Sequence, residues 1–293
     1  GKDFVHPYMP NSVPEIKQEM LLELGVESIE DIYKSVIPEE LLYKERLDLP
    51  EPILSEHALK KHVMGILEKN VSTEEYTSFL GAGCYKHQVP ALCDEINSRG
   101  EFLTGYCGDT YSDHGKMQAI FEYTSMMGEL LDADVVSYTN YDGGQAVSSS
   151  LRIALRVMRS RNTPKSVLLV PSTMNPEIFA QAREYCRSEG RIDKVAYERE
   201  TGLMDLKDLE ERLKSGDVAA VFYENPSYLG FFETRGEKIA ELAHKYGALC
   251  IAQPEVAALG VMESPMNQGA DLVCGDIQPL GMHIQYGGGQ AGF

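Results

Sequence analysis

Positive charge is scarce in this sequence. Its 293 residues contain 27 lysines and arginines against 45 aspartates and glutamates, which gives a formal net charge of −18. Nucleic-acid backbones and anionic lipid surfaces repel a protein this acidic, because proteins that bind them present clustered basic side chains. The charge balance therefore argues against nucleic-acid partners and against membrane-surface binding.

Long apolar runs and paired cysteines are also missing, and we expect no secretory leader. No run approaches the roughly 20 apolar residues that a membrane-spanning helix needs. The first 14 residues lack the basic start and apolar stretch of a secretory signal. The six cysteines lie far apart without a C-x-x-C pair, which is typical of reduced thiols. We therefore expect a cytoplasmic protein that does not enter a membrane.

Common motifs for metals and hydrolytic nucleophiles are absent as well. The seven histidines are scattered and form no H-E-x-x-H pair, and no G-x-S-x-G turn occurs. The segment 287–292 matches G-x-G-x-x-G, but a dinucleotide site needs a strand before this motif and a helix after it. No helix follows in the printed sequence, so we expect a glycine-rich turn there, and no metal site.

The first hundred residues have a helical pattern. Val13, Ile16, Met20 and Leu24 recur at helical spacing before Gly25, which favours the end of a helix. Ser28 and Ser55 are predicted to cap two further helices, on either side of a proline-containing linker. We expect residues 1–115 to form a helical N-terminal arm with pocket loops. A plain helical subdomain of the same fold is the alternative.

From about residue 116 the pattern changes to short apolar runs that alternate with amphipathic helices. Strands are predicted at 166–171, 194–197, 218–223, 248–252 and 271–274, and helices at about 116–130, 144–161, 176–189, 205–214 and 233–246. Continuous apolar strands between helices predict an α/β domain over 116–293, with a mostly parallel sheet covered on both faces. Ligands bind at the carboxyl ends of such strands, so the loops after Val170, Tyr223, Ala252 and Cys274 are candidate site loops.

Three polar segments are candidates for binding or chemistry. The loop Thr104–Gly115 is rich in hydroxyl groups, and its His114 suits either a general acid–base or a surface and capping role. Tyr141–Gly144 precedes a helix whose first N–H groups suit an anion, although Asp142 is equally a helix cap. The segment Glu224–Gly230 follows a predicted strand on the ligand side of the sheet, and its Asn-Pro and Gly residues are also ordinary turn chemistry.

Several short motifs, taken together, resemble a known family. They are Phe79-Leu-Gly-Ala-Gly83, Gln118–Tyr123, Tyr141-Asp-Gly143, Asn225–Gly230, Ala258-Leu-Gly260, Gly269–Val273, Gln278–Gly281 and Gly287-Gly288. In this order they are similar to subunit 1 (alpha) of the glycine cleavage system P-protein, the decarboxylating glycine dehydrogenase. The resemblance implies a fold-type I PLP-dependent transferase-like fold, where PLP is pyridoxal 5'-phosphate. It also implies a heterotetramer.

In that family the Schiff-base lysine resides on the partner, subunit 2 (beta), which thus holds PLP covalently. The absence of any lysine after Lys245 agrees with this. The implied reaction releases CO2 from glycine, a small amino-acid substrate, and passes the aminomethyl group to the lipoyl arm of the H-protein carrier. This chain is expected to supply part of the pocket wall and to be inactive alone. The family continues beyond the position of Phe293 into a smaller C-terminal domain, which we expect to be absent here.

The resemblance also implies residue roles, as hydrogen bonds to the substrate carboxylate or the cofactor phosphate across the subunit interface. The expected catalytic residues are Tyr106, Thr104 and His114. The expected cofactor-binding residues are Tyr141, Asp142, Gly143 and Asn225. At the end of a predicted strand, Glu255 is a further candidate for the pyridine nitrogen of the cofactor.

The loop Thr104–Gly115 departs from the family pattern, since it is one residue shorter and keeps little beyond Thr104 and Tyr106. One alternative is therefore a subunit of a related decarboxylase that acts on a different amino acid. A second alternative is a non-catalytic scaffold partner with a degenerate PLP fold.

Overall fold

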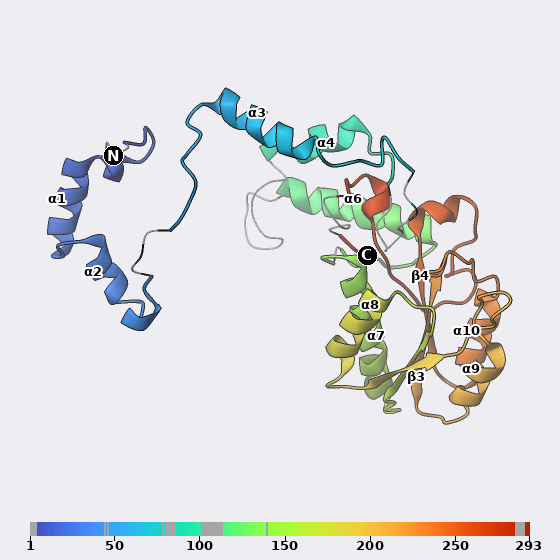
Figure 1. The fold of residues 1–293 in the computed structure, drawn as a ribbon. Coiled ribbons are helices and arrows are strands. Elements are labelled where there is room, and N and C mark those ends of the chain that lie inside the picture. The colour runs from blue at the N-terminus through green and yellow to red at the C-terminus, as the bar shows by residue number, and fades with distance from the viewer. Residues whose placement is uncertain are drawn as a thin grey trace. The chain divides into compact units, whose positions relative to one another are not determined.

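The computed structural model describes residues 5–43, 45, 47–77, 79, 86–100, 114–138, 140–284 and 291–293. The chain divides into two compact units, Gly1–Val71 and Ser72–Phe293 (Figure 1). The boundary predicted near residue 115 follows a segment, 101–113, that lies outside the described residues, and it stays a prediction. No helix of the described part has the length and apolar character needed to cross a bilayer.

The first unit consists of short helices, as the sequence predicts. They are η1 (Pro10–Ser12), α1 (Pro14–Leu24), α2 (Ile29–Lys34), η2 (Glu39–Leu41) and α3 (Glu56–Leu67). Gly25 ends α1 in a left-handed conformation with φ +70°, which glycine adopts without a steric penalty. Ser28 forms a capping box with Asp31, and the Ser55 hydroxyl accepts the N–H of Ala58.

The helices of this first unit have little core of their own. Among its described residues only Leu21 is buried. The apolar positions of α3 that predicted this helix, Leu59, Val63, Ile66 and Leu67, remain 42–51% exposed. The helical spacing therefore defines an apolar face without a partner inside the unit.

The second unit is built on a parallel sheet with the strand order β2-β1-β3-β4-β5. The strands are β1 (Val167–Pro171), β2 (Arg191–Val195), β3 (Val218–Asn225), β4 (Leu249–Pro254) and β5 (Leu272–Val273). The helices are α4 (Ala91–Asn97), α6 (His114–Leu131), α7 (Gly143–Ser160), α8 (Pro176–Cys186), α9 (Leu206–Leu213) and α10 (Gly236–Lys245), with the short η3 (Val256–Gly260) and η4 (Gln278–Leu280). The predicted covered parallel sheet is confirmed.

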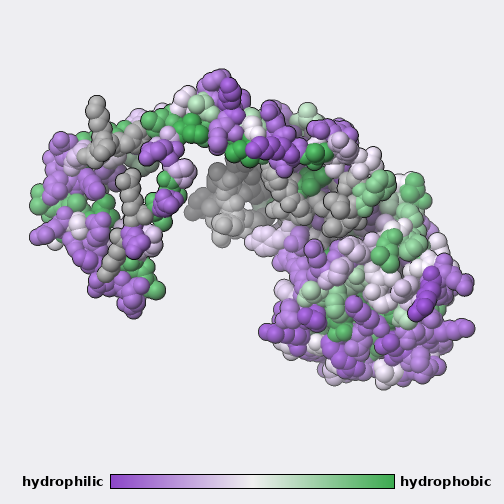
Figure 2. Space-filling model, viewed as in Figure 1, coloured by the Kyte–Doolittle hydropathy of each residue, from purple (hydrophilic) through white to green (hydrophobic). Residues whose placement is uncertain are grey.

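Two cores lie on opposite faces of this sheet. One packs α7 and α8 against Leu168, Val170 and Phe222, and the other packs α9 and α10 against Leu169 and Tyr223. In Figure 1 these helix pairs flank the strands on either side. Because successive strand residues point to opposite faces, a strand covered on both sides must be apolar throughout. Most of the outer surface over α8, α9 and α10 visible in Figure 2 is hydrophilic.

The predicted bounds of the second strand were wrong. Residues 194–197 were expected, but β2 spans Arg191–Val195 and pairs only with β1 at the edge of the sheet. Four of its five residues are not fully buried, so its sequence carries charges that hide the strand pattern. Tyr197 has already left the sheet and forms an isolated bridge with Met204.

Candidate functional site

A cavity of about 390 Å³ opens at the carboxyl ends of β3 and β4. Its wall includes Gly143 and Gly144 of α7, Asn175 and Ile178 at the start of α8, residues 224, 226–228 and 230 from β3 and its loop, residues 253–255 from β4, and also His87 and Asp276. This is the sheet edge where the sequence predicted a ligand, because parallel strands leave their connecting loops on one side.

Glu224 is the most buried acid of this cavity, with only 6% of the residue exposed. Its carboxylate accepts the backbone N–H of Asn175 at 3.1 Å and that of Tyr228 at 3.2 Å. Burial raises the pKa of Glu224 to about 7, against the effect of these two hydrogen bonds. Glu224 thus joins the start of α8 to the loop after β3.

Two further carboxylates, Glu255 and Asp276, complete an acidic lining. Burial raises the pKa of both groups above its ordinary value, and the neighbouring imidazole of His87 acts in the opposite direction. Asp276 accepts the N–H of Gln278 at 2.7 Å. The Nε2 atom of His87 and the Oε1 atom of Gln253 are buried without a hydrogen-bond partner among the described residues. The cavity is therefore lined by three carboxyl groups, those of Glu224, Glu255 and Asp276, and by further polar atoms that have no hydrogen-bond partner in the described part of the chain.

The loop after β3 is closed by Asn225. The side-chain amide donates to the carbonyl of Glu233 at 3.2 Å and accepts the N–H of Glu233 at 3.1 Å. Asn225 is 5% exposed and is not in the cavity wall. A turn role, which the Asn-Pro sequence also favoured, is therefore what its contacts show, and a direct cofactor contact stays a prediction.

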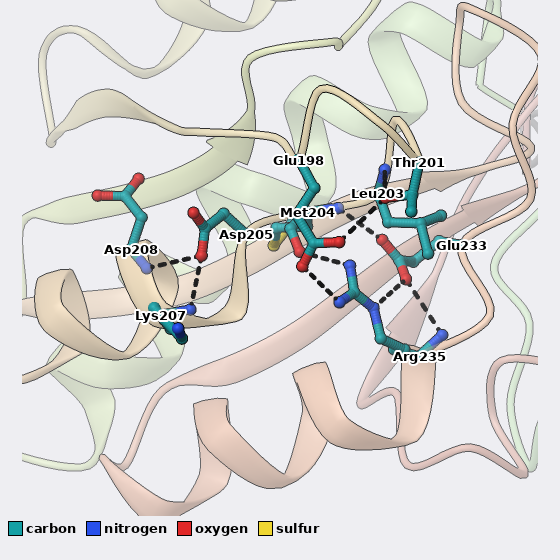
Figure 3. Close-up of polar contacts among 9 residues, drawn as sticks. All are labelled: Glu198, Thr201, Leu203, Met204, Asp205, Lys207, Asp208, Glu233 and Arg235. Carbon is teal, nitrogen blue, oxygen red and sulfur yellow. Dashed lines mark hydrogen bonds and ion pairs between the residues drawn. The ribbon is translucent and has the colours of Figure 1, made fainter.

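Glu233 and Arg235, which the sequence analysis did not single out, contact the segment that contains Glu198 and Met204 (Figure 3). Arg235 donates to the Glu198 carboxylate at 2.8 Å and to the Met204 carbonyl at 2.7 Å. Glu233, which is 6% exposed, accepts the N–H of Met204 at 2.9 Å. The only available sequence signal was a pair of opposite charges directly after a turn.

The start of α7 brings together three of the predicted residues. The Asp142 carboxylate accepts the N–H of Gln145 at 2.6 Å and so caps the helix. The Gln145 side chain in turn accepts the N–H of Tyr141 at 2.7 Å. A Cβ atom on Gly143 would lie 3.0 Å from the Cβ of Asp276, so glycine permits this close approach. The Tyr141 side chain lies outside, with the residue 81% exposed.

The side chains of the three expected catalytic residues lie outside the described part of the structure. Thr104 and Tyr106 lie outside the described residues. His114 begins α6, but its side chain is outside the description. Of the seven expected catalytic and cofactor-binding residues, Gly143 is the one that lies in the described cavity wall, and the further candidate Glu255 lies there too. The roles of all seven stay predictions.

Residues 6–293 match the family model of the glycine cleavage system P-protein. The chain belongs to this family. Among its relatives, the probable glycine dehydrogenase (decarboxylating) subunit 1 of Aeropyrum pernix is 40% identical over 291 residues, which cover 97% of this chain and 61% of that relative. The chain thus spans about three fifths of the length of the curated relatives that it matches.

Solved structures confirm the fold-type I class of this P-protein chain. A crystal structure of the glycine decarboxylase (P-protein) of the glycine cleavage system, in inhibitor-bound form, superposes with a TM-score of 0.80 and 31% identity, covering 99% of this chain and 62% of the other. A sphingosine-1-phosphate lyase from Burkholderia pseudomallei has a TM-score of 0.58 at 12% identity, over 87% of this chain and 61% of its own, and shows the fold alone.

PLP is the cofactor that this P-protein fold implies, and its chemistry requires a lysine for the Schiff base and a position for the phosphate dianion. The cavity wall contains no lysine or arginine among the described residues, and it contains three carboxylates. No lysine follows Lys245 in the sequence. The residues of this cavity therefore do not fit PLP.

Proposed function

We propose that this chain is the lysine-free subunit of a PLP-dependent glycine decarboxylase. Its partner is the lysine-bearing subunit 2 (beta) in a cytoplasmic heterotetramer, and the partner holds PLP covalently. The complex releases CO2 from glycine and passes the aminomethyl group to the lipoylated H-protein, and this chain alone is inactive. The observation that carries the proposal is the family match over residues 6–293, and the absence of lysine from the described residues of the cavity wall supports it.

In this proposal the chain's own residues form the wall and the rim of the working site. Tyr141 is exposed, so its phenol is free to contact the partner-held cofactor across the interface. Asp142, Gly143 and Asn225 support that contact by fixing the backbone at the start of α7 and after β3. Thr104, Tyr106 and His114 bind the substrate carboxylate or transfer protons to and from the substrate.

The test is exchange of labelled bicarbonate into the carboxyl group of glycine. The assay contains this chain in full length, subunit 2 from the same source, PLP and lipoylated H-protein, and each is omitted in turn. Exchange that disappears when this chain is omitted supports the proposal. Exchange of unchanged rate without this chain would instead identify a scaffold partner without a role in catalysis.

The departure of the loop Thr104–Gly115 from the family pattern favours one second candidate, a decarboxylase subunit for another amino acid. A screen of amino acids with the assembled, PLP-loaded complex separates the two. Glycine as the fastest substrate supports the main proposal. Faster CO2 release from a different amino acid would replace it and would assign the choice of substrate to this loop.

A further inference from the structure

The start of α7 is the natural place for an anion in this cavity. The first N–H groups of a helix lack partners within the helix, and the helix dipole adds partial positive charge there. Phosphates therefore bind at such ends in many α/β folds. Gly143 and Gly144, the first two residues of α7, both lie in the cavity wall.

In this chain two carboxylates of the protein, those of Asp142 and Asp276, already lie at the start of α7. The N–H of Gln145 donates to Asp142 at 2.6 Å. Asp276 packs directly against Gly143, and the backbone of Gly143 opposes the effect of burial on the pKa of Asp276. Two negative charges thus occupy the helix end that would otherwise attract an anion from solution.

Asp276 is held at this position by the backbone. The residue pairs with Gly292 in an isolated bridge, and Gly292 also bridges to Asn140 on the other side. The N–H of Asn140 donates to the carbonyl of Gly292 at 2.8 Å, and that of Ile277 donates to Ala291 at 3.1 Å. The strip 291–293 therefore joins the segment before α7 to the segment that carries Asp276.

Packing leaves no space between these two segments. A Cβ atom added to Gly143 would lie 3.0 Å from the Cβ of Asp276 and 3.2 Å from its backbone nitrogen. An ion with the size of phosphate cannot enter this gap without moving Asp276. The backbone and the Cβ of Asp276 are thus packed against the helix end, which keeps its carboxylate close to the start of α7.

The remaining charges of the cavity act in the same direction. Glu224 and Glu255 add two more acids to the wall, and no lysine or arginine of the described residues lines it. The segments 80–85, 101–113 and 285–290, which the description leaves out, contain no lysine or arginine in their sequence, and Lys116 is the one lysine of the second unit whose side chain is also left out. A phosphate dianion in this cavity would meet like charges at short range in a medium of low polarity.

We propose that Asp142 and Asp276 take the anion position at the start of α7 and make this cavity exclude phosphate. The cavity is then a counterpart of the fold's cofactor site that rejects PLP and other phosphorylated ligands. Loading of PLP on the lysine-bearing subunit alone follows from this exclusion, and that consequence rests on the proposed function. The exclusion itself is a property of this chain.

The test uses the complex of the full-length chain with its partner, saturated with PLP, and inorganic phosphate as the probe. Phosphate binding is measured by isothermal titration calorimetry for the native complex and for a D142N/D276N variant. Asparagine keeps an oxygen that accepts the helix N–H groups while the charge is removed. We expect the affinity for phosphate to rise about tenfold or more in the variant, because two repulsive charges are lost at the helix end.

A matched control carries the same change in net charge away from the cavity. Glu200→Gln and Glu241→Gln are both exposed, and the pair should leave phosphate binding unchanged. An equal gain in this control would overturn the proposal, because it would show a general effect of net charge. The proposal would also be overturned if the native complex bound phosphate as tightly as the D142N/D276N variant. A folded variant whose affinity for phosphate does not rise would overturn it as well.

Folding of the variant is checked by its thermal unfolding. Should the double variant not fold, the single Asp276→Asn variant, which keeps the cap of α7, provides the same comparison. The glycine exchange assay reports separately on the proposed function. Absent exchange together with the expected phosphate result would remove the glycine decarboxylase proposal and leave the exclusion standing.

Discussion

The side-chain amide of Asn225 and the backbone of Glu233 exchange two hydrogen bonds, of 3.1 and 3.2 Å, across the loop that follows β3. Both residues are almost fully buried. The pair closes the loop in the way that a backbone pair closes a hairpin. The rim of the cavity therefore depends on a side chain that does not line it.

Replacing Asn225 with alanine should lower the free energy of unfolding by about 1–3 kcal/mol, because the N–H and carbonyl of Glu233 lose their partner while they stay buried. Urea unfolding measures the change. Asn267→Ala is the matched control: its amide donates to Asp132 at the exposed surface, and a change within about 0.5 kcal/mol is expected. Equal effects at the two positions would contradict the role assigned to Asn225.

The carboxyl group of Glu224 should make the stability of the chain depend on pH. Its pKa is raised to about 7 in the folded state, so between the ordinary pKa near 4.5 and pH 7 the folded state binds more protons than the unfolded state. Stability therefore falls as pH rises through this window, by at most about 3 kcal/mol, and stays lower above pH 7.

The Glu224→Gln variant removes this titration, since glutamine stays neutral. From pH 4.5 to pH 7 the unfolding free energy of the native chain should fall relative to that of the variant. Above pH 7 the difference between the two should become constant. Urea unfolding at a series of pH values measures it. A difference that is constant over the whole range would show that Glu224 titrates normally.

Replacing Gly143 with alanine should destabilise the chain by about 2 kcal/mol or more, because the new Cβ would crowd the Cβ and the backbone nitrogen of Asp276. Gly260→Ala is the control, since no atom lies within 4 Å of a Cβ at that position, and its effect should stay within about 0.5 kcal/mol. Thermal unfolding compares the two variants. A tolerated alanine at 143 would mean that the segment with Asp276 is free to move.

Under the proposed function, in which the Tyr106 hydroxyl bonds to substrate or cofactor, replacing Tyr106 with phenylalanine should lower the exchange activity of the complex without dissociating it, because only this hydroxyl group is lost. A tenfold or greater loss is expected, since a buried hydrogen bond to a charged group contributes about 1.5–3 kcal/mol. The exchange assay and size-exclusion chromatography measure the two properties. Unchanged activity would remove Tyr106 from the catalytic set.

Features that depend on neighbouring residues in the sequence were predictable. The caps at Ser28 and Ser55 were predicted because a hydroxyl before a helix reaches an N–H two or three residues later. The central strands were predicted because burial on both faces requires continuous apolar sequence. The strand β2 was misplaced because an edge strand tolerates charged residues and so loses that signal.

Features that depend on distant parts of the chain were not predictable. Arg235 meets Glu198 across 37 residues, and nothing local indicates that pairing. Glu255 was a candidate from its place after a strand, but its meeting with Glu224 and Asp276 was missed for a similar reason, since the three acids come from separate loops and strand ends. Glu224 did carry a signal, because it directly follows the apolar run Val218–Tyr223 on the ligand side of the sheet.

Neighbouring residues of β3 belong to different cores, with Phe222 facing α7 and α8 and Tyr223 facing α9 and α10. A substitution in one helical layer thus has few direct contacts with the other layer, and double-mutant cycles across the sheet should give coupling energies close to zero. The two layers are free to diverge independently in evolution. The cavity, which sits on the strand ends between them, would keep its shape through such drift as long as the backbone of the sheet is preserved.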